Sequence, residues 1–402
     1  PGARRYGNEM SHLLQRSAWT LALALGLAAC APLPKHADGQ AASFRISVRH
    51  PGASSNKPQE CTLVQIKDAK GFPSGYTMTV ESVICPDQTC RIITVTMTWD
   101  ALGHYQRFEL PAGETLEKCI PEKGKPAGDW DAAPFTNADY QKLDGILKDE
   151  NSLLWRQKLA GVVRLNNKSA VDGITGATPA SVRSAVVEGA ALTCYNLWHW
   201  ANGDVAEAAL ELTHQQCGEP MLLHFLTSDK PRYVLFALEH LRLHKLFSPA
   251  AVEAVKRAMS GADSERIDLG LAYLREALPE RARFSEALAS VIGARAGGGR
   301  AHLLDRLGAE AALPDAFFEA VAAGLPEWKD YYEVHLFLQL AEKRGVAPQA
   351  LIAQVAKLLE GSDFFIARRA HGFLSGLPAL DAQTQARLQA FRDKAAREGR
   401  SL

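Results

Sequence analysis

The last 200 residues carry a repeated spacing that restricts the possible fold more than any other feature of the sequence. From Gly203 onwards, alanine and leucine dominate, no segment alternates like a strand, and the helical runs are separated by Pro, Gly, Ser and Asp. A period of about 33 residues predicts helical hairpins that bury their apolar faces against their neighbours. The similar helix starts lie at Arg232, Arg266, Arg300, Tyr332 and Phe365, and each is followed by a second helical run.

This repeat resembles a HEAT-like α-solenoid, so residues 203–402 are expected to form an all-α solenoid of helical hairpins. The period is shorter than is usual for HEAT repeats and close to that of tetratricopeptide repeats, whose Trp-Leu-Gly-Tyr pattern is absent. The resemblance implies a surface that binds another macromolecule. The alternative is a helical cap that only stabilises the preceding domain.

Residues 43–202 are predicted to form an α+β domain. The clearest strand is 91–99, where Ile93, Val95, Met97 and Trp99 fall on one face and threonines on the other. A turn over 100–103 and a return strand would complete a hairpin. The remaining expected elements are strands at 44–48, 76–84, 105–110 and 161–165, a loop at 121–135, a helix from Thr136 with Asp139 in a capping box, and a short helix at 152–160.

The segment Asp172–Ser181 is the one stretch whose residue types indicate chemistry rather than packing. Its two glycines, Gly173 and Gly176, permit a tight backbone path. Thr178 stands before Pro179, which favours a helix N-terminus. We therefore predict a helix over about 179–201, with Thr178 as its N-cap. Unpaired backbone N–H groups at that position favour a bound phosphate.

The residues Asp172, Thr175, Gly176, Ala177 and Thr178 resemble the flavinylation motif of FMN-binding domains, as found in sodium-pump and Rnf-type subunits. The resemblance implies that a flavin transferase attaches FMN to Thr178 through a phosphoester bond. The upstream glycine-rich strand region of those domains is not clearly present. The alternative is a glycine-rich loop that ends in a Thr-Pro helix start and joins two domains.

The beginning of the chain has the pattern of a lipoprotein signal peptide. Residues 1–9 read as translated upstream sequence, and an apolar run from Ser17 to Leu27 leads to Leu27-Ala-Ala-Cys30. This end resembles a bacterial lipobox, which implies cleavage before Cys30 and acylation of its sulfur. No aspartate follows the cysteine, so we expect a membrane-anchored protein on the periplasmic side of the outer membrane. Residues 31–42 read as a tether.

The six other cysteines predict disulfides in an exported protein. Plausible pairs are Cys85 with Cys90, Cys61 with Cys119, and Cys194 with Cys217. Their spacing does not indicate a metal site. Lys+Arg and Asp+Glu both number 45, and no basic patch is interleaved with aromatic residues, so nucleic-acid binding is not expected.

Few other residues suggest chemistry. His240 and His244 lie four residues apart and could hold a metal, but no third ligand is evident in the sequence, so no metal is predicted. Trp198, His199 and Trp200 read as core packing, and Trp155 is a better stacking partner for a flavin. No catalytic residue can be named, and the chain reads as an electron carrier or a scaffold rather than a turnover enzyme.

Two functions are consistent with these patterns. The first is an envelope lipoprotein that transfers electrons through covalent FMN and docks a redox or envelope protein on its helical repeats. The second is a lipoprotein scaffold without a cofactor, in which the Asp172 segment only links two domains.

Overall fold

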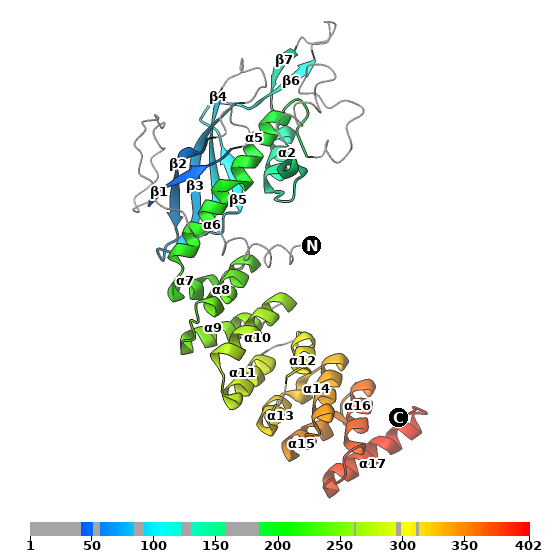
Figure 1. Ribbon diagram of the computed structural model, residues 1–402. Coiled ribbons are helices and arrows are strands. Elements are labelled where there is room, and N and C mark those ends of the chain that lie inside the picture. The colour runs from blue at the N-terminus through cyan, green and yellow to red at the C-terminus, as the bar shows by residue number, and fades with distance from the viewer. Residues whose placement is uncertain are drawn as a thin grey trace.

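The computed structural model describes residues 42–50, 57–83, 92–121, 130–157, 185–260, 263–294, 299–310 and 313–402. Within these ranges all strands precede Phe135, and from Ala191 onwards every regular element is helical. An α+β part is thus followed by an all-α part, as the sequence predicts. Figure 1 shows the sheet at one end and the helices leading away from it to the C-terminus.

The larger sheet is a five-stranded antiparallel meander in the order β1-β2-β3-β4-β5. The predicted alternation in β4 is confirmed, because Ile93, Val95, Met97 and Trp99 are buried while the threonines between them are partly exposed. Tyr76 of β3 lies opposite Trp99, so two large side chains share one face. The strands are β1 (Ser43–Val48), β2 (Gln59–Lys67), β3 (Pro73–Val83), β4 (Ile92–Asp100) and β5 (Tyr105–Glu109).

A second, two-stranded sheet is formed by β6 (Glu117–Pro121) and β7 (Trp130–Pro134). The expected loop over 121–135 is therefore wrong for β7. Four of its five residues (Asp, Ala, Ala and Pro) are types that strands disfavour, and the antiparallel pairing with β6 provides their backbone partners. The N–H of Cys119 in β6 also donates to the carbonyl of Gly189, 2.8 Å away.

Three helices cover the inner face of the larger sheet: α2 (Asn137–Lys148), α5 (Ala191–Asn202) and α6 (Asp204–Gln216). α2 begins after the predicted capping box, in which Thr136 and Asp139 each accept from the other's backbone N–H. At the start of the short helix expected at 152–160 the structure has the 3₁₀ turn η1 (Leu153–Arg156), and residues 158–160 lie outside the described ranges. α5 packs against β3 and α6 against β1.

α5 begins later than the sequence predicts. Residues 185–190 are a turn, so the helix does not run continuously from 179, and Thr178 is not its N-cap. Gly189 interrupts helical geometry with φ +77°, and its Cα lies so close to the backbone of Cys119 that a side chain would clash. Val186 and Val187 are buried in the core instead of forming a helical turn.

The helices of the all-α part lie in two layers, and each helix contacts the next in its layer. The five helix starts predicted from the sequence lie within two residues of the observed starts of the helices in the first layer. The repeat spacing marks all five, and an Asp cap marks three of them. Asp263, Asp330 and Asp363 cap α10, α14 and α16. The first layer is α8 (Pro231–Leu243), α10 (Ser264–Ala277), α12 (Ala301–Leu307), α14 (Tyr331–Arg344) and α16 (Phe364–Ser375). The second is α9 (Pro249–Ser260), α11 (Arg281–Ala294), α13 (Asp315–Ala322), α15 (Gln349–Leu358) and α17 (Ala382–Arg397).

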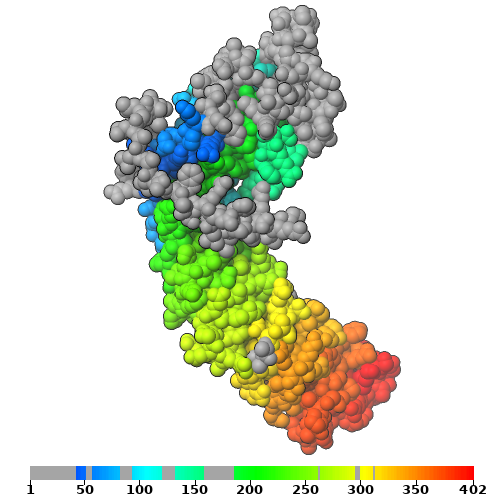
Figure 2. All heavy atoms as spheres, viewed as in Figure 1, coloured from blue at the N-terminus to red at the C-terminus, as the bar shows by residue number. Residues whose placement is uncertain are grey.

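The turn between β4 and β5 connects the sheet to the helical layers. Ala101 and Leu102 belong to the helical core, and the N–H of Ala101 donates to the Tyr233 hydroxyl, 3.0 Å away. The buried Asp100 carboxylate lies 3.3 Å from the guanidinium of Arg232 on α8. Figure 2 shows the helices continuing from this region as a long body that ends in α17.

The residue after the C-cap of α8 has a backbone conformation that is rare for its residue type. Lys245 has φ 53° and is the one non-glycine residue with positive φ in the described ranges. The N–H of Leu246 donates to Leu241, as Val346 donates to Ala341 after α14, where Gly345 has φ 63°. The two helices therefore end in the same type of cap.

We expect Lys245→Gly to raise the free energy of unfolding by about 0.5–1 kcal/mol. Glycine removes the cost of the left-handed conformation, which exceeds the entropy it adds to the unfolded chain. Urea unfolding followed by circular dichroism measures the change. The reciprocal variant Gly345→Lys should destabilise by a similar amount. A loss of stability in Lys245→Gly would contradict this reading.

Candidate functional site

A surface pocket of about 430 Å³ lies where α2, η1 and the turn before α5 meet. Its volume is within the range of about 300–1,000 Å³ usual for small-molecule sites. Ala185, the first described residue after the Asp172–Ser181 segment, is part of its wall. The lining residues are Lys142, Gly145, Ile146, Asp149, Asn151, Ser152, Leu153 and Ala185.

Local hydrogen bonds fix the polar side of this pocket. Asp149 ends α2, and its carboxylate accepts from the N–H of Asn151 at 3.0 Å. The Ser152 hydroxyl caps η1 by accepting from the N–H of Leu154. From α5, the indole of Trp198 donates to the carbonyl of Asp149, 2.9 Å away. The polar wall is therefore held in place by the core helix behind it.

Trp155 lies next to the pocket in the chain and exposes 48% of its surface. The guanidinium of Arg156 lies 4.5 Å from the centre of its ring. An exposed indole can stack on a planar ligand, so the structure leaves the predicted stacking partner accessible.

The Trp198–Trp200 cluster has a packing role, as the sequence indicates. Both indoles are buried, and the His199 ring lies edge-on to Trp198 at 5.0 Å. Burial, together with His50 nearby, lowers the pKa of His199 to about 4, so this imidazole is neutral at neutral pH. None of these three rings lines the pocket.

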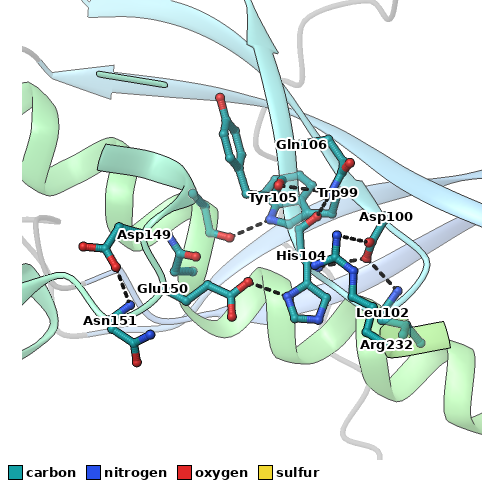
Figure 3. A network of polar contacts seen from close by, with 12 residues as sticks. Trp99, Asp100, Leu102, His104, Tyr105, Gln106, Asp149, Glu150, Asn151 and Arg232 are labelled. Atoms are coloured by element: carbon teal, nitrogen blue, oxygen red, sulfur yellow. Dashed lines mark hydrogen bonds and ion pairs between the residues drawn. The ribbon is translucent and has the colours of Figure 1, made fainter. Parts of the chain in front are cut away.

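A polar network joins the pocket region to the junction with the helices. Figure 3 shows His104, which follows the β4–β5 turn, directed at Glu150, while the backbone N–H groups of Leu102 and His104 point to Asp100. The Tyr105 hydroxyl donates to Asp144 of α2, and burial raises the pKa of Tyr105 far above its usual value. This phenol therefore stays protonated at neutral pH, and its hydrogen bond links β5 to α2.

A second cluster of ligand-type side chains lies at the start of the helical part. Cys217, which ends α6, lies beside His240 and His244 at the end of α8. The two histidines were recognisable from their spacing, but the third member was not, because Cys217 is 23 residues away in the sequence. Burial, with His214 and His244 nearby, lowers the pKa of His240 to about 3, while burial raises the pKa of the Cys217 thiol.

The predicted pairing of Cys194 with Cys217 is wrong. Cys194 is buried in α5, where its sulfur accepts from the N–H of Val187, whereas the Cys217 sulfur faces the two histidines. The helices are consecutive, but these cysteines lie near opposite ends of the pair. The predicted pairing of Cys61 with Cys119 is also wrong, because these residues lie in β2 and β6 of two different sheets and are not joined to each other by a disulfide.

Several predicted sites lie outside the residues that the structure describes. They include Asp172, Thr175, Gly176, Ala177 and Thr178, the lipid-attachment candidate Cys30, the strand at 161–165, and the pair Cys85 and Cys90. These stay predictions.

Comparisons with protein families, curated proteins and solved structures find no match to this chain. None of the helices in the described ranges has the length and apolar character that crossing a bilayer requires.

Proposed function

We propose that this protein is an electron carrier with FMN attached to Thr178. The observation that supports this proposal most is the motif Asp172-x-x-Thr175-Gly176-Ala177-Thr178. Its last residue, Thr178, precedes Ala185 in the pocket wall by seven positions. Seven residues span at most about 25 Å. A flavin on Thr178 would therefore be tethered within reach of that pocket.

The residues around the pocket suit such a group. Lys142 and the polar wall of Asn151 and Ser152 offer hydrogen-bond partners, and Ile146 and Leu153 offer apolar surface. The exposed Trp155 provides a face for an isoalloxazine ring. FMN would supply the one- and two-electron chemistry, and the chain would supply its orientation and partial shelter from water.

Attachment would be a phosphoryl transfer. The Thr178 oxygen would form a phosphoester with the FMN phosphate and lose its proton, while the pyrophosphate bond of a flavin dinucleotide donor breaks and releases the nucleoside monophosphate. The chain would thus be the substrate of a flavin transferase.

The signal-peptide pattern that ends at Cys30 supports a lipid anchor, which would hold the protein on the periplasmic side of the outer membrane.

We further propose that the all-α part is a HEAT-like solenoid that docks a redox or envelope protein. Helices of one layer contact their neighbours, which is the contact pattern of a linear repeat. In the first layer, ion pairs connect Arg242 to Glu276, Asp268 to Arg306, and Glu342 to Arg369.

The test of flavin attachment is mass spectrometry of the full chain co-expressed with a flavin transferase. A peptide containing Thr178 should gain the mass of one FMN less one water. Thr178→Ala should lose all covalent flavin, whereas Thr227→Ala, at an exposed threonine before α8, should keep it. An unmodified Thr178 peptide from active co-expression, with a known acceptor modified in parallel, would overturn the proposal.

The second candidate, a scaffold without a cofactor, is favoured by exposed aromatic side chains on adjacent first-layer helices: Tyr331 and Tyr332 on α14, and Phe365 on α16. Such residues commonly anchor protein interfaces. Under this function, Thr178→Ala would cost little and partner binding would persist in colourless protein.

A further inference from the structure

We propose that Cys217, His240 and His244 bind a Zn²⁺ ion at the junction between α6 and α8. The ligand atoms of these three side chains all lie within 4.8 Å of one another. A thiolate with two imidazoles is a donor set that suits zinc. The site is independent of the proposed flavin attachment, because it uses none of the same residues.

The distances fit a single ion. His240 Nδ1 and His244 Nε2 lie 3.4 Å apart, and the Cys217 sulfur lies 3.9 Å from the first and 4.0 Å from the second. From usual zinc bond lengths, tetrahedral ligands would place two nitrogens about 3.4 Å apart and sulfur about 3.6 Å from each nitrogen. A shift of a few tenths of an ångström in the Cys217 side chain closes the difference.

The fold gathers these ligands from two helices. His240 and His244 lie one turn apart on the same face of α8, as the i, i+4 spacing requires. The His240 ring is held against Phe236 at 4.1 Å between ring centres, and against His214 at 4.5 Å. Cys217 reaches them from the C-cap of α6, because the short helix α7 (Glu219–Phe225) turns the chain back towards α8.

The three ligands leave one position of a tetrahedral ion open. Within the described ranges, the cluster contains no fourth His, Cys, Asp or Glu. His244 is exposed, so the open position can take water or a ligand from solution. A bound ion would also join α6, the last helix that packs against the sheet, to α8, the first helix of the first layer. It would therefore hold the two parts of the chain together.

Spectroscopy of the full chain with Co²⁺ and direct titration with Zn²⁺ test the site. Reduced, metal-free wild-type protein should bind one Zn²⁺ at this cluster, and Co²⁺ should give a thiolate-to-cobalt charge-transfer band. Cys217→Ser should lose that band and weaken Zn²⁺ binding at least tenfold. His240→Gln and His244→Gln should weaken it similarly.

A matched control separates this site from adventitious binding. His371→Gln changes a histidine on α16, far along the helical part, and should leave the band and affinity unchanged. Circular dichroism of each variant confirms folding, and Zn²⁺ should raise the melting temperature of wild type but not of Cys217→Ser. Equal Zn²⁺ binding by wild type and all three variants would overturn the proposal, as would binding of copper but not zinc.

Discussion

Glu333→Ala is expected to lower the free energy of unfolding by about 3–5 kcal/mol, because it removes the carboxylate that is paired with a buried guanidinium. Glu333 exposes 1% of its side chain and Arg300 exposes 10%. The carboxylate accepts from both the backbone N–H and the guanidinium of Arg300, at 2.6 and 2.9 Å. It therefore accepts from the backbone at the start of α12 and pairs with the charge of Arg300, the N-cap residue of that helix.

The surroundings of Arg300 prevent a simple rearrangement. Its Nε donates to the carbonyl of Ile292, and its guanidinium lies 4.6 Å from the centre of the Trp328 ring. Without Glu333, the buried guanidinium loses the carboxylate that offsets the cost of its burial. The pair links α12 to α14, so its loss should weaken the packing between these neighbouring helices.

Urea unfolding followed by circular dichroism measures this loss. As a control, Glu327→Ala changes an exposed residue of the 3₁₀ turn η3 (Leu325–Glu327), which lies between α13 and α14. This variant should change the free energy of unfolding by less than about 0.5 kcal/mol. The double variant Arg300→Met with Glu333→Leu should recover most of the loss, since apolar residues of similar size can replace a buried ion pair. A single variant as stable as wild type would show that the pair is not buried in solution.

Gly103→Ala is expected to destabilise the protein by about 2–4 kcal/mol, from two separate causes. Gly103 has φ +78°, where any side chain costs about 1–2 kcal/mol. A Cβ there would also overlap the backbone carbonyl oxygen of Ala206 on α6, and such overpacking costs about 1–3 kcal/mol. The overlap with Ala206 would disturb the contact between the β4–β5 turn and α6.

Gly113→Ala isolates the backbone cost. Gly113 has φ +84°, but a Cβ there would meet no atom within 4 Å. Its replacement should therefore cost only about 1–2 kcal/mol. The difference between the two variants, measured by urea unfolding under identical conditions, gives the contribution of the contact with Ala206. Equal losses would mean that the turn does not press closely against α6.

The sequence predicts most of the regular structure because local and distant signals agree there. The alternation around Val95 identifies β4 by itself, since a half-buried strand requires it. Asp263, Asp330 and Asp363 mark helix starts by a local mechanism, and the spacing of about 33 residues supports each of them. Thr136 and Asp139 likewise fix the start of α2.

The remaining features depend on contacts that no local pattern encodes. The late start of α5 follows from the approach of Gly189 to Cys119, two segments distant in the chain. β7 has its partner only when β6 is present. Cys217 becomes a neighbour of His240 only through the turn that α7 makes. In each case the deciding partner is a tertiary one.

Because each first-layer helix contacts the next in its layer, the length of this region can change by one hairpin without altering the sheet or its joint with α8. An inserted or deleted unit would move the C-terminal end towards or away from the pocket by one step. The number of helical units therefore sets the distance between the sheet and the C-terminal end of the chain.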